Sequence, residues 1–433
     1  MQTTNKIVKS FAMMIAILTL VCLGSAARVK IEHAAGSGHG QVYIDATMEI
    51  AALFNQLQDE ITVEVTVVAG NEPLIVRTAA GVPPDTFTAI GYGDLAGRDM
   101  LLPLDSFLKK DDLAKAFVPA SLEQGRWLGQ LVQLPLFAQP AVTYYNTWLF
   151  EAAGVQSPNE LAAQEMWTWD TLVDVGRKIS ADKSGDGILD IYATGGSWVS
   201  MERLVFWLGQ SGAYYFDKLT NPTATRIKTP EFERALTFVH SLAHEHHITE
   251  VSALIGMPLT KFSNGEAGTM FDGPWRIAKG IRDAGMPNDA WDIAPMLTGP
   301  GGNPAFIHCD GVQISSITNH PEEAWTWASF LAADPRSTQI LMDRVQRPTA
   351  HIRTLMRYTE MITVEGYPKH ANTFWDILTT ATTAIRTVPL IPNTDRFYAV
   401  HSAEIRSFLE GRQSVVTTLE RLDHAFSQLL KED

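Results

Sequence analysis

The sequence predicts an α/β protein built as two lobes, and three observations lead to this prediction. The chain has 433 residues, of which 45% are hydrophobic, and this is more apolar material than one core normally holds. Its first part alternates β-branched runs with helical patterns, which is typical of a sheet with helices on its faces. No repeat or low-complexity tract interrupts the pattern. Sheets of this kind bind ligands at the carboxyl ends of their strands.

The first elements follow one another in a regular order. Residues 29–33 (VKIEH) alternate apolar and polar side chains, which predicts a half-buried strand, and the glycine-rich run 36–40 ends it. A helical pattern then extends to about Leu57. Residues 62–69 (TVEVTVVA) predict a second strand, and a second helix covers 74–80 before a proline pair stops it.

The later helices are marked by their caps and apolar faces. Thr168 precedes a helix that begins with tryptophan and aspartate, and residues 319–323 (NHPEE) place proline and acids in a first turn. The last helix carries Leu419, Leu422 and Phe426 on one face. These signals continue the α/β pattern to the C-terminal end.

Residues 1–27 have the composition of a targeting signal. Two lysines precede the run 11–23, which is apolar except for one threonine, and small residues follow at Ser25 and Ala27. The apolar run is shorter than the ~20 residues that a membrane-spanning helix needs. We therefore expect a cleaved signal peptide and a periplasmic or otherwise extracytoplasmic mature protein, with an uncleaved anchor as the alternative.

The charge and the cysteines exclude several classes of protein. The 34 basic and 48 acidic residues give a net charge of −14, which repels phosphate backbones and anionic lipids. Neither nucleic acid nor a membrane surface is therefore an expected partner. Two cysteines, Cys22 and Cys309, cannot build a disulfide framework, and we expect Cys309 to be a small buried hydrophobe.

Several segments, in a fixed order along the chain, resemble a known family. Residues 79–85 read AAGVPPD, and residues 143–155 read TYYNTWLFEAAGV. The further segments are WTWDTLVDVGRKI (167–179), FSNGEAGTMFDGPWRIAKG (262–280), WDIAPMLTGPGG (291–302), HPEEAWTWASFLAADP (320–335) and FLEGRQSVVTTLERLDHAF (408–426). In this order they are similar to the extracellular solute-binding proteins of ABC importers, in the sugar-binding family that includes maltose-binding protein.

The resemblance implies a two-lobed periplasmic binding protein fold of type II, with discontinuous lobes joined by hinge strands. It implies that lobe one comprises residues 28–138 plus 298–345, and that lobe two comprises 139–297 plus 346–433. The chain is then expected to cross between lobes near 135–143, 293–297 and 345–348. A cleft between hinged lobes gains contacts with its ligand only when it shuts, so ligand shifts an equilibrium between open and closed forms.

The resemblance also implies a function without catalysis. A monomer would capture a mono- or oligosaccharide in the cleft and deliver it to the permease subunits of an ABC transporter, with no required cofactor. The alternatives are glycerol phosphate or a related anionic solute as the ligand, and a secreted glycoside hydrolase, which needs two carboxylates in a cleft. The sequence has no G-x-S-x-G, phosphate-loop or H-E-x-x-H motif.

Sugar sites stack rings on aromatic side chains and bind hydroxyls through polar groups. Trp275, in Gly273-Pro274-Trp275, aligns with the family tryptophan that stacks on sugar, and Gly273 allows a close approach of the backbone. The weaker candidates lie at predicted strand or hinge ends and are His39, Tyr92, Phe137, Trp198, Trp207, Asp310, Arg347 and Trp375. Arg347 has a planar fork that suits vicinal hydroxyls or a carboxylate. Core packing is the alternative for the aromatic residues, and a salt bridge is the alternative for Arg347.

One acidic loop resembles a calcium-binding loop. Its oxygen-bearing side chains stand at positions 1, 3, 5 and 9, a glycine stands at position 6, and position 7 offers a backbone carbonyl. These candidate calcium ligands are Asp182, Ser184, Asp186, Ile188 and Asp190. The twelfth position is Ala193 rather than a glutamate, so a turn whose side chains bind their own backbone is the alternative.

Overall fold

The computed structural model describes residues 28–89, 91–256, 259–381, 384–386, 390–391 and 394–432. The expected signal peptide, residues 1–27, lies outside the described residues, so its cleavage stays a prediction. In the part of the chain that the structure describes, no helix is both long and apolar enough to span a bilayer.

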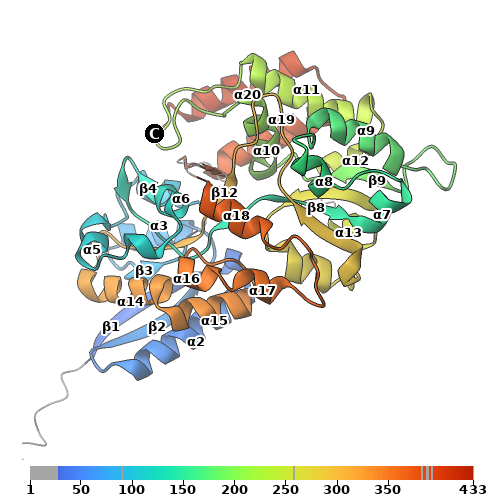
Figure 1. The fold of residues 1–433 in the computed structure, drawn as a ribbon. Coiled ribbons are helices and arrows are strands. Elements are labelled where there is room, and N and C mark those ends of the chain that lie inside the picture. The colour runs from blue at the N-terminus through green and yellow to red at the C-terminus, as the bar shows by residue number, and fades with distance from the viewer. Residues whose placement is uncertain are drawn as a thin grey trace, which may run out of the picture.

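Strands and helices alternate at the start of the chain and follow in longer runs after it, and Figure 1 shows two lobes. The strands are β1 (Val29–Gly36), β2 (Ile61–Val68), β3 (Thr86–Phe87), β4 (Arg126–Trp127), β5 (Gln130–Leu131), β6 (Leu134–Pro135), β7 (Gln139–Pro140), β8 (Val142–Asn146), β9 (Tyr192–Gly195), β10 (Ala267–Asp272), β11 (Trp291–Ala294), β12 (Phe306–His308), β13 (Gly311–Ile314) and β14 (Ile385–Arg386). The helices are α2 (Gln41–Leu57), α3 (Glu72–Ala79), α4 (Gly93–Ala96), α5 (Asp105–Lys110), α6 (Pro119–Gln124), α7 (Thr147–Ala152), α8 (Pro158–Ala163), α9 (Trp169–Ile179), α10 (Met201–Ser211), α11 (Pro230–His244), α12 (Val251–Ile255), α13 (Leu259–Ser263), α14 (Pro321–Ala333), α15 (Pro335–Val345), α16 (Ile352–Leu355), α17 (Tyr358–Ile362), α18 (Thr373–Thr380), α19 (Thr394–Leu409) and α20 (Val415–Leu429).

The predicted opening order of strand, helix, strand, helix is confirmed by β1, α2, β2 and α3. Strand β1 pairs in parallel with β2 along its whole length and with β3 at its carboxyl half. The five-stranded sheet has the order β2-β1-β3-β13-β6, and β13 enters it antiparallel from much later in the chain. Helices α2, α14 and α15 pack beside this sheet at the bottom of Figure 1.

A second sheet of order β11-β8-β10-β9 lies in the other lobe. Helices α9 to α12, α19 and α20 lie above it in Figure 1, and a core rich in aromatic residues fills the space between them. In that core the rings of Trp169 and Phe238 stack with centroids 4.2 Å apart. The cap predicted at Thr168 is confirmed, because its side chain accepts a hydrogen bond from the backbone N–H of Thr171 in the first turn of α9.

The chain passes between the two sheets in the regions where crossings are predicted. It leaves the first sheet after β6 and joins the second at β8, and it leaves the second after β11 and returns to the first at β13. After α15, residues 348–350 run beside the first crossing, since the backbone N–H of Ala138 donates to Pro348 O at 3.1 Å. The strands of the first sheet all fall within the predicted lobe one, and those of the second within lobe two. The residues at which the lobes divide stay predictions.

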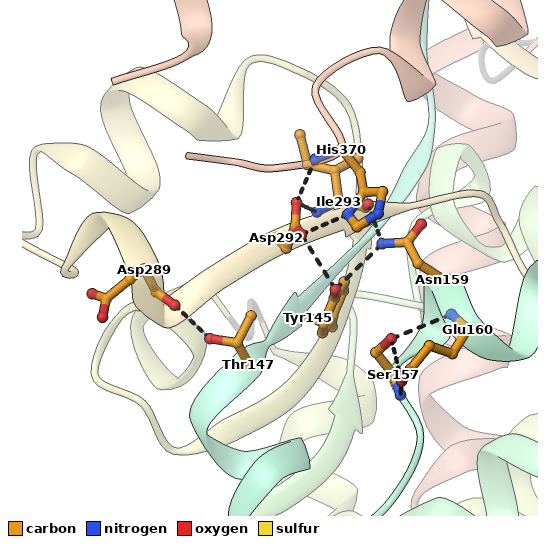
Figure 2. A network of polar contacts seen from close by, with 9 residues as sticks. All are labelled: Tyr145, Thr147, Ser157, Asn159, Glu160, Asp289, Asp292, Ile293 and His370. Atoms are coloured by element: carbon orange, nitrogen blue, oxygen red, sulfur yellow. Dashed lines mark hydrogen bonds and ion pairs between the residues drawn. The ribbon is translucent and has the colours of Figure 1, made fainter. Parts of the chain in front are cut away.

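A buried polar network anchors the second sheet beside the crossings (Figure 2). The carboxylate of Asp292, on β11, accepts hydrogen bonds from Nδ1 of His370 at 2.7 Å and from the hydroxyl of Tyr145 at 3.3 Å. Asn159 Nδ2 donates both to that hydroxyl and, at 2.8 Å, to the backbone oxygen of Ile293. Because a buried carboxylate is costly without donors, this network ties β8, β11 and the segment before α18 to one another.

Cys309 follows the sequence prediction. It is 5% exposed within the core that covers the first sheet, and burial raises the pKa of its thiol to about 12. The thiol therefore stays protonated and behaves as an apolar side chain.

Candidate functional site

Two adjoining cavities lie between elements of the two lobes and share Gly38 and Glu202. We call the first, of about 200 Å³, the tryptophan cavity; it is lined by Gly38, His39, Gln139, Glu202, Arg203, Phe206, Asp272, Trp275, His308, Asp310 and Arg347. We call the second, of about 290 Å³, the acidic cavity; its lining includes Asn71, Glu72, Asp94, Glu202, Asp395 and Tyr398. Together they form a cleft with the size and polar lining of a small-molecule site.

One wall of the tryptophan cavity comes from the carboxyl end of β1. At this end a Cβ on Gly36 would lie 2.3 Å from the backbone oxygen of Thr88, so only glycine fits there. The 3-10 turn Ser37–His39 follows and places His39 at the cavity. This is the position at which parallel α/β sheets offer space for ligands.

The opposite wall is built at the end of β10. The backbone turns at Gly273, where a Cβ would lie 2.2 Å from the Trp275 ring, so the indole folds back over the glycine. The ring is partly exposed, and its face meets His308 edge-on, with centroids 5.8 Å apart and planes at 76°. The hydroxyl of Tyr144 donates to Gly273 O at 2.9 Å and holds this turn on the sheet.

Asp310 is the centre of one charged cluster. His308 Nε2 donates to Asp310 Oδ1 at 2.9 Å, and Gln139 Nε2 donates to Oδ2 at 3.0 Å. Burial alone would raise the pKa of Asp310, but the two nearby histidines, the His308 hydrogen bond and Arg347 together hold it well below its usual range. Burial likewise works to lower the pKa of His308, and the Asp310 charge reverses the sign, so that the pKa of His308 is raised.

Asp272 is the centre of a second charged cluster, on the other lobe. Arg276 Nε donates to its Oδ2 at 2.6 Å, and Arg203 approaches the same oxygen at 3.2 Å. The backbone N–H of Gly273 donates to Oδ1 at 2.9 Å. Both oxygens of this buried carboxylate are therefore bonded within the protein.

Other polar groups at the tryptophan cavity have unused bonding capacity. The ring nitrogens of His39 and Oε1 of Gln139 are buried without a hydrogen-bond partner in the described structure. Burial lowers the pKa of His39 against the opposing effect of Asp310, so its imidazole is neutral and offers one N–H donor and one acceptor. Arg347 reaches Asp310 only at 4.0 Å. Since buried polar atoms without partners are rare in native proteins, these groups suit a polar ligand.

The structure brings four of the residues predicted from sequence to one cavity, namely Trp275, His39, Asp310 and Arg347. Gly273 lies directly behind the indole. Their contact with a ligand stays a prediction.

The other predicted ligand residues do not line this cleft. Trp198, Trp207, Phe137 and Tyr92 are at most 1% exposed and belong to the hydrophobic cores. Tyr92 donates its hydroxyl to Gln124 O at 2.8 Å, and Trp198 packs edge-on against Trp207 at 5.1 Å. Trp375, on α18, packs half-buried against the core of the first sheet. For the four buried residues the structure corrects the predicted placement, because core packing offers no surface to a ligand, and Trp375 lines neither cavity of the cleft.

Sequence reasoning missed several cavity residues, namely Gln139, Glu202, Arg203, Phe206, Asp272 and His308. Asp272 could have been found, since it ends a strand directly before Gly273. Glu202, Arg203 and Phe206 lie on α10 and carry no local signal, because only the packing of that helix turns them toward the cleft.

The acidic loop at 182–190 is closed by its own hydrogen bonds. The carboxylate of Asp182 accepts backbone N–H groups of Gly185 at 2.6 Å and Gly187 at 2.8 Å, and Asp190 accepts those of Lys183 and Ser184. Throughout the described ranges, no group of three or more histidine, cysteine or carboxylate side chains is placed to hold a metal ion.

A larger cavity of about 620 Å³ lies elsewhere, against Val205 and Leu208 of α10 and residues 212–219. None of the predicted ligand residues lines it. Phe206, on the same helix, lines the tryptophan cavity instead.

The match to the family of bacterial extracellular solute-binding proteins covers residues 41–335. The chain belongs to this family. Its fold is the two-lobed periplasmic binding protein fold, as predicted. The family and the similar structures are binding proteins.

Two solved structures show how far the likeness extends. The ABC substrate-binding protein of Listeria monocytogenes in complex with cycloalternan has a TM-score of 0.74 at 21% identity, covering 93% of this chain and 99% of that one. The cyclic alpha-maltosyl-1,6-maltose binding protein of Arthrobacter globiformis has a TM-score of 0.73 at 19% identity, covering 94% and 100%. A binding protein of Brucella abortus (strain 2308) is 24% identical over 327 residues, which are 73% of this chain and 75% of that protein.

Proposed function

We propose that this solute-binding protein captures a carbohydrate in the cleft between its lobes and delivers it to the permease subunits of an ABC transporter. The observation that carries the proposal is the Trp275 indole, partly exposed in a cavity whose other walls hold charged and hydrogen-bonding groups. This pairing matches a sugar, which has apolar C–H faces and a belt of hydroxyls. The saccharides named for the two structural relatives support it.

The contacts made by each residue suggest its role. Trp275 would stack on a sugar ring, with Gly273 providing the space behind the indole. His39, Gln139 and Arg347 would bind hydroxyls or other polar groups of the ligand. Asp310 would hold Gln139 and His308 in place, and Asp272 would hold Arg203 and Arg276, because these carboxylates are already bonded within the protein.

We expect binding without turnover. A glycosidase needs a carboxylic acid with a raised pKa as its proton donor. Asp310 does not fit that role, because the histidines and the arginine around it lower its pKa. We therefore expect the ligand to be released unchanged, from a monomeric protein working outside the cytoplasm.

The experiment is a ligand screen with two readouts. Saccharides are titrated into the protein while tryptophan fluorescence is followed, and the recovered sugar is analysed by chromatography. We expect at least one saccharide to change the fluorescence saturably, to lower the radius of gyration in X-ray scattering as the lobes close, and to be recovered intact. Products in the chromatogram, or no response across the screen, would contradict the proposal.

We expect binding to need no added cofactor, and the loop at 182–190 provides a separate test. The calcium hypothesis predicts that Ca²⁺ raises the Tm, that EDTA reverses the rise and that Mg²⁺ does not replace Ca²⁺. An unchanged Tm would favour the alternative, a turn closed by the backbone hydrogen bonds of Asp182 and Asp190.

A further inference from the structure

The tryptophan cavity has more free donors than free acceptors. The two buried carboxylates, Asp272 and Asp310, already accept hydrogen bonds on both of their oxygens. The buried side-chain atoms of this cavity that lack a partner in the described structure are Oε1 of Gln139, which is an acceptor, and the two His39 nitrogens, which offer one donor and one acceptor. A neutral sugar needs acceptors for its hydroxyl hydrogens, and those left here are Gln139 Oε1, one His39 nitrogen and the carboxylate of Glu202 at the border with the acidic cavity.

The donor with the most unused capacity is Arg347. Its guanidinium carries five N–H groups, is 20% exposed, and has as its closest carboxylate within the described ranges Asp310, at 4.0 Å. Charge-assisted hydrogen bonds are normally about 2.7–2.9 Å long, so this contact leaves the fork free to bind elsewhere. Arg203, by contrast, is engaged, because its Nη2 donates to both oxygens of Asp272, at 3.2 and 3.4 Å.

The charged groups at this cavity also favour an anionic ligand. Among the described residues, the carboxylates of Glu202, Asp272 and Asp310 are accompanied by the guanidinium groups of Arg203, Arg276 and Arg347. His308, whose pKa is raised, adds a further cation when it is protonated. The three guanidinium groups balance the three carboxylates, so a protonated His308 leaves one positive charge at this cavity, although the whole chain carries a net charge of −14.

The neighbouring acidic cavity has the opposite character. Among the described residues, the charged side chains that line it are Glu72, Asp94, Glu202 and Asp395, all of them carboxylates. They repel an anion and accept hydrogen bonds from hydroxyls. A ligand with a negative group at one end and hydroxyls at the other would therefore enter the cleft in one orientation.

We propose that the ligand is an acidic saccharide, with a sugar carboxylate bound by Arg347 and His39 in the tryptophan cavity and its remaining hydroxyls facing the acidic cavity. The inference rests on the proposed function and specifies its ligand class. The planar guanidinium fork matches a carboxylate through two parallel hydrogen bonds. Trp275 supplies the apolar face for the same ring, and Gln139 Oε1 accepts from one of its hydroxyls.

The test compares each sugar with its own 6-carboxylate by titration calorimetry. The pairs are glucose and glucuronate, galactose and galacturonate, and mannose and mannuronate, each as the monosaccharide and as the disaccharide, with glucose 6-phosphate as a second anion. We expect at least one uronate to bind ten or more times tighter than its neutral partner, and the preference to weaken as salt is added.

The variant that removes the fork is Arg347→Gln, and its matched control is Arg344→Gln. Arg344 lies three residues earlier, is 61% exposed, and pairs with Glu49 away from the cleft. We expect Arg347→Gln to lose the preference for the uronate while the control keeps it, with circular dichroism and Tm reporting whether each variant folds. The wild-type comparison stands by itself if Arg347→Gln does not fold.

The outcomes separate this inference from the proposed function. A neutral sugar that binds as tightly as its uronate overturns the acidic ligand and leaves carbohydrate capture intact. Tighter binding of glucose 6-phosphate than of every uronate overturns the carboxylate in favour of a phosphate. If none of these compounds and no saccharide of the wider screen binds, both proposals fall.

Discussion

Two tryptophans of this protein share one local motif and have different surroundings. Gly196-Ser197-Trp198 and Gly273-Pro274-Trp275 follow β9 and β10, which are neighbouring parallel strands. In each motif a Cβ on the glycine would lie 2.2 Å from the indole two residues later. Both indoles therefore fold back over a glycine at the same edge of the sheet.

The difference lies in what faces each ring. Trp198 has no exposed surface and meets Trp207 edge-on at 5.1 Å, and its backbone N–H donates to Leu254 O at 2.9 Å. Trp275 is partly exposed and lies beside His308, the last residue of β12, with ring centroids 5.8 Å apart. The local motif fixes the fold-back of the ring, and its role depends on whether a helix or the opposite lobe lies across from it.

The largest expected effect is that of Trp198→Ala on stability. Removing this fully buried indole should lower the free energy of unfolding by about 3–5 kcal/mol, because a cavity replaces its packing. Urea unfolding measures this change. A loss below about 1 kcal/mol would mean that the ring is not part of the core and would remove the contrast with Trp275.

The paired substitutions Gly196→Ala and Gly273→Ala test the difference between the buried Trp198 ring and the partly exposed Trp275 ring. Each methyl group would push an indole out of place. Gly196→Ala should cost about 1–3 kcal/mol of stability, since the Trp198 ring has no free space to enter. Gly273→Ala should cost less, because the Trp275 ring can move into the cleft, and should lower ligand affinity instead. Equal losses of stability, measured side by side in urea, would argue against this distinction.

The substitution Trp275→Ala should act on binding with little effect on folding. A stacked ring contributes about 0.5–1.5 kcal/mol beyond its burial, so the Kd for the ligand found in the screen should rise several-fold or more. Calorimetry gives the Kd, and a thermal melt gives the stability. An unchanged Kd would show that Trp275 does not contact the ligand, and Trp375→Ala, outside the cleft, serves as the control.

The smallest expected effect is a pH-dependent one at the partner of Trp275. The pKa of His308 is raised in the folded state, so its contribution to stability is present below its unfolded pKa of about 6.5 and is lost as the pH rises through the folded value. The lowered pKa of Asp310 works in the opposite sense and keeps its contribution above pH ~4. His308→Gln should therefore destabilise the protein more at pH 5.5 than at pH 8.5, as measured by urea unfolding at the two pH values. A loss that grows with pH would contradict this assignment.

Several features of this protein follow from the sequence by itself. The opening elements from β1 to α3 were predictable because alternation of period two and helical periodicity are local patterns. The cap at Thr168 depends on a side chain three residues from its partner. The family could be recognised from short segments in a fixed order, and Trp275 was predicted at the cleft because it aligns with a tryptophan of that family.

The composition of the cleft was decided only by the tertiary structure. Helix α10 presents Trp207 to the core and Glu202, Arg203 and Phe206 to the cavity, and its sequence alone does not tell these faces apart. Asp310, His39 and Arg347 come from distant parts of the chain and meet because β13 joins β1 and β3 in one sheet while α15 ends beside the crossing. Local sequence determines how a segment folds onto itself, whereas the surroundings of a side chain depend on residues hundreds of positions away.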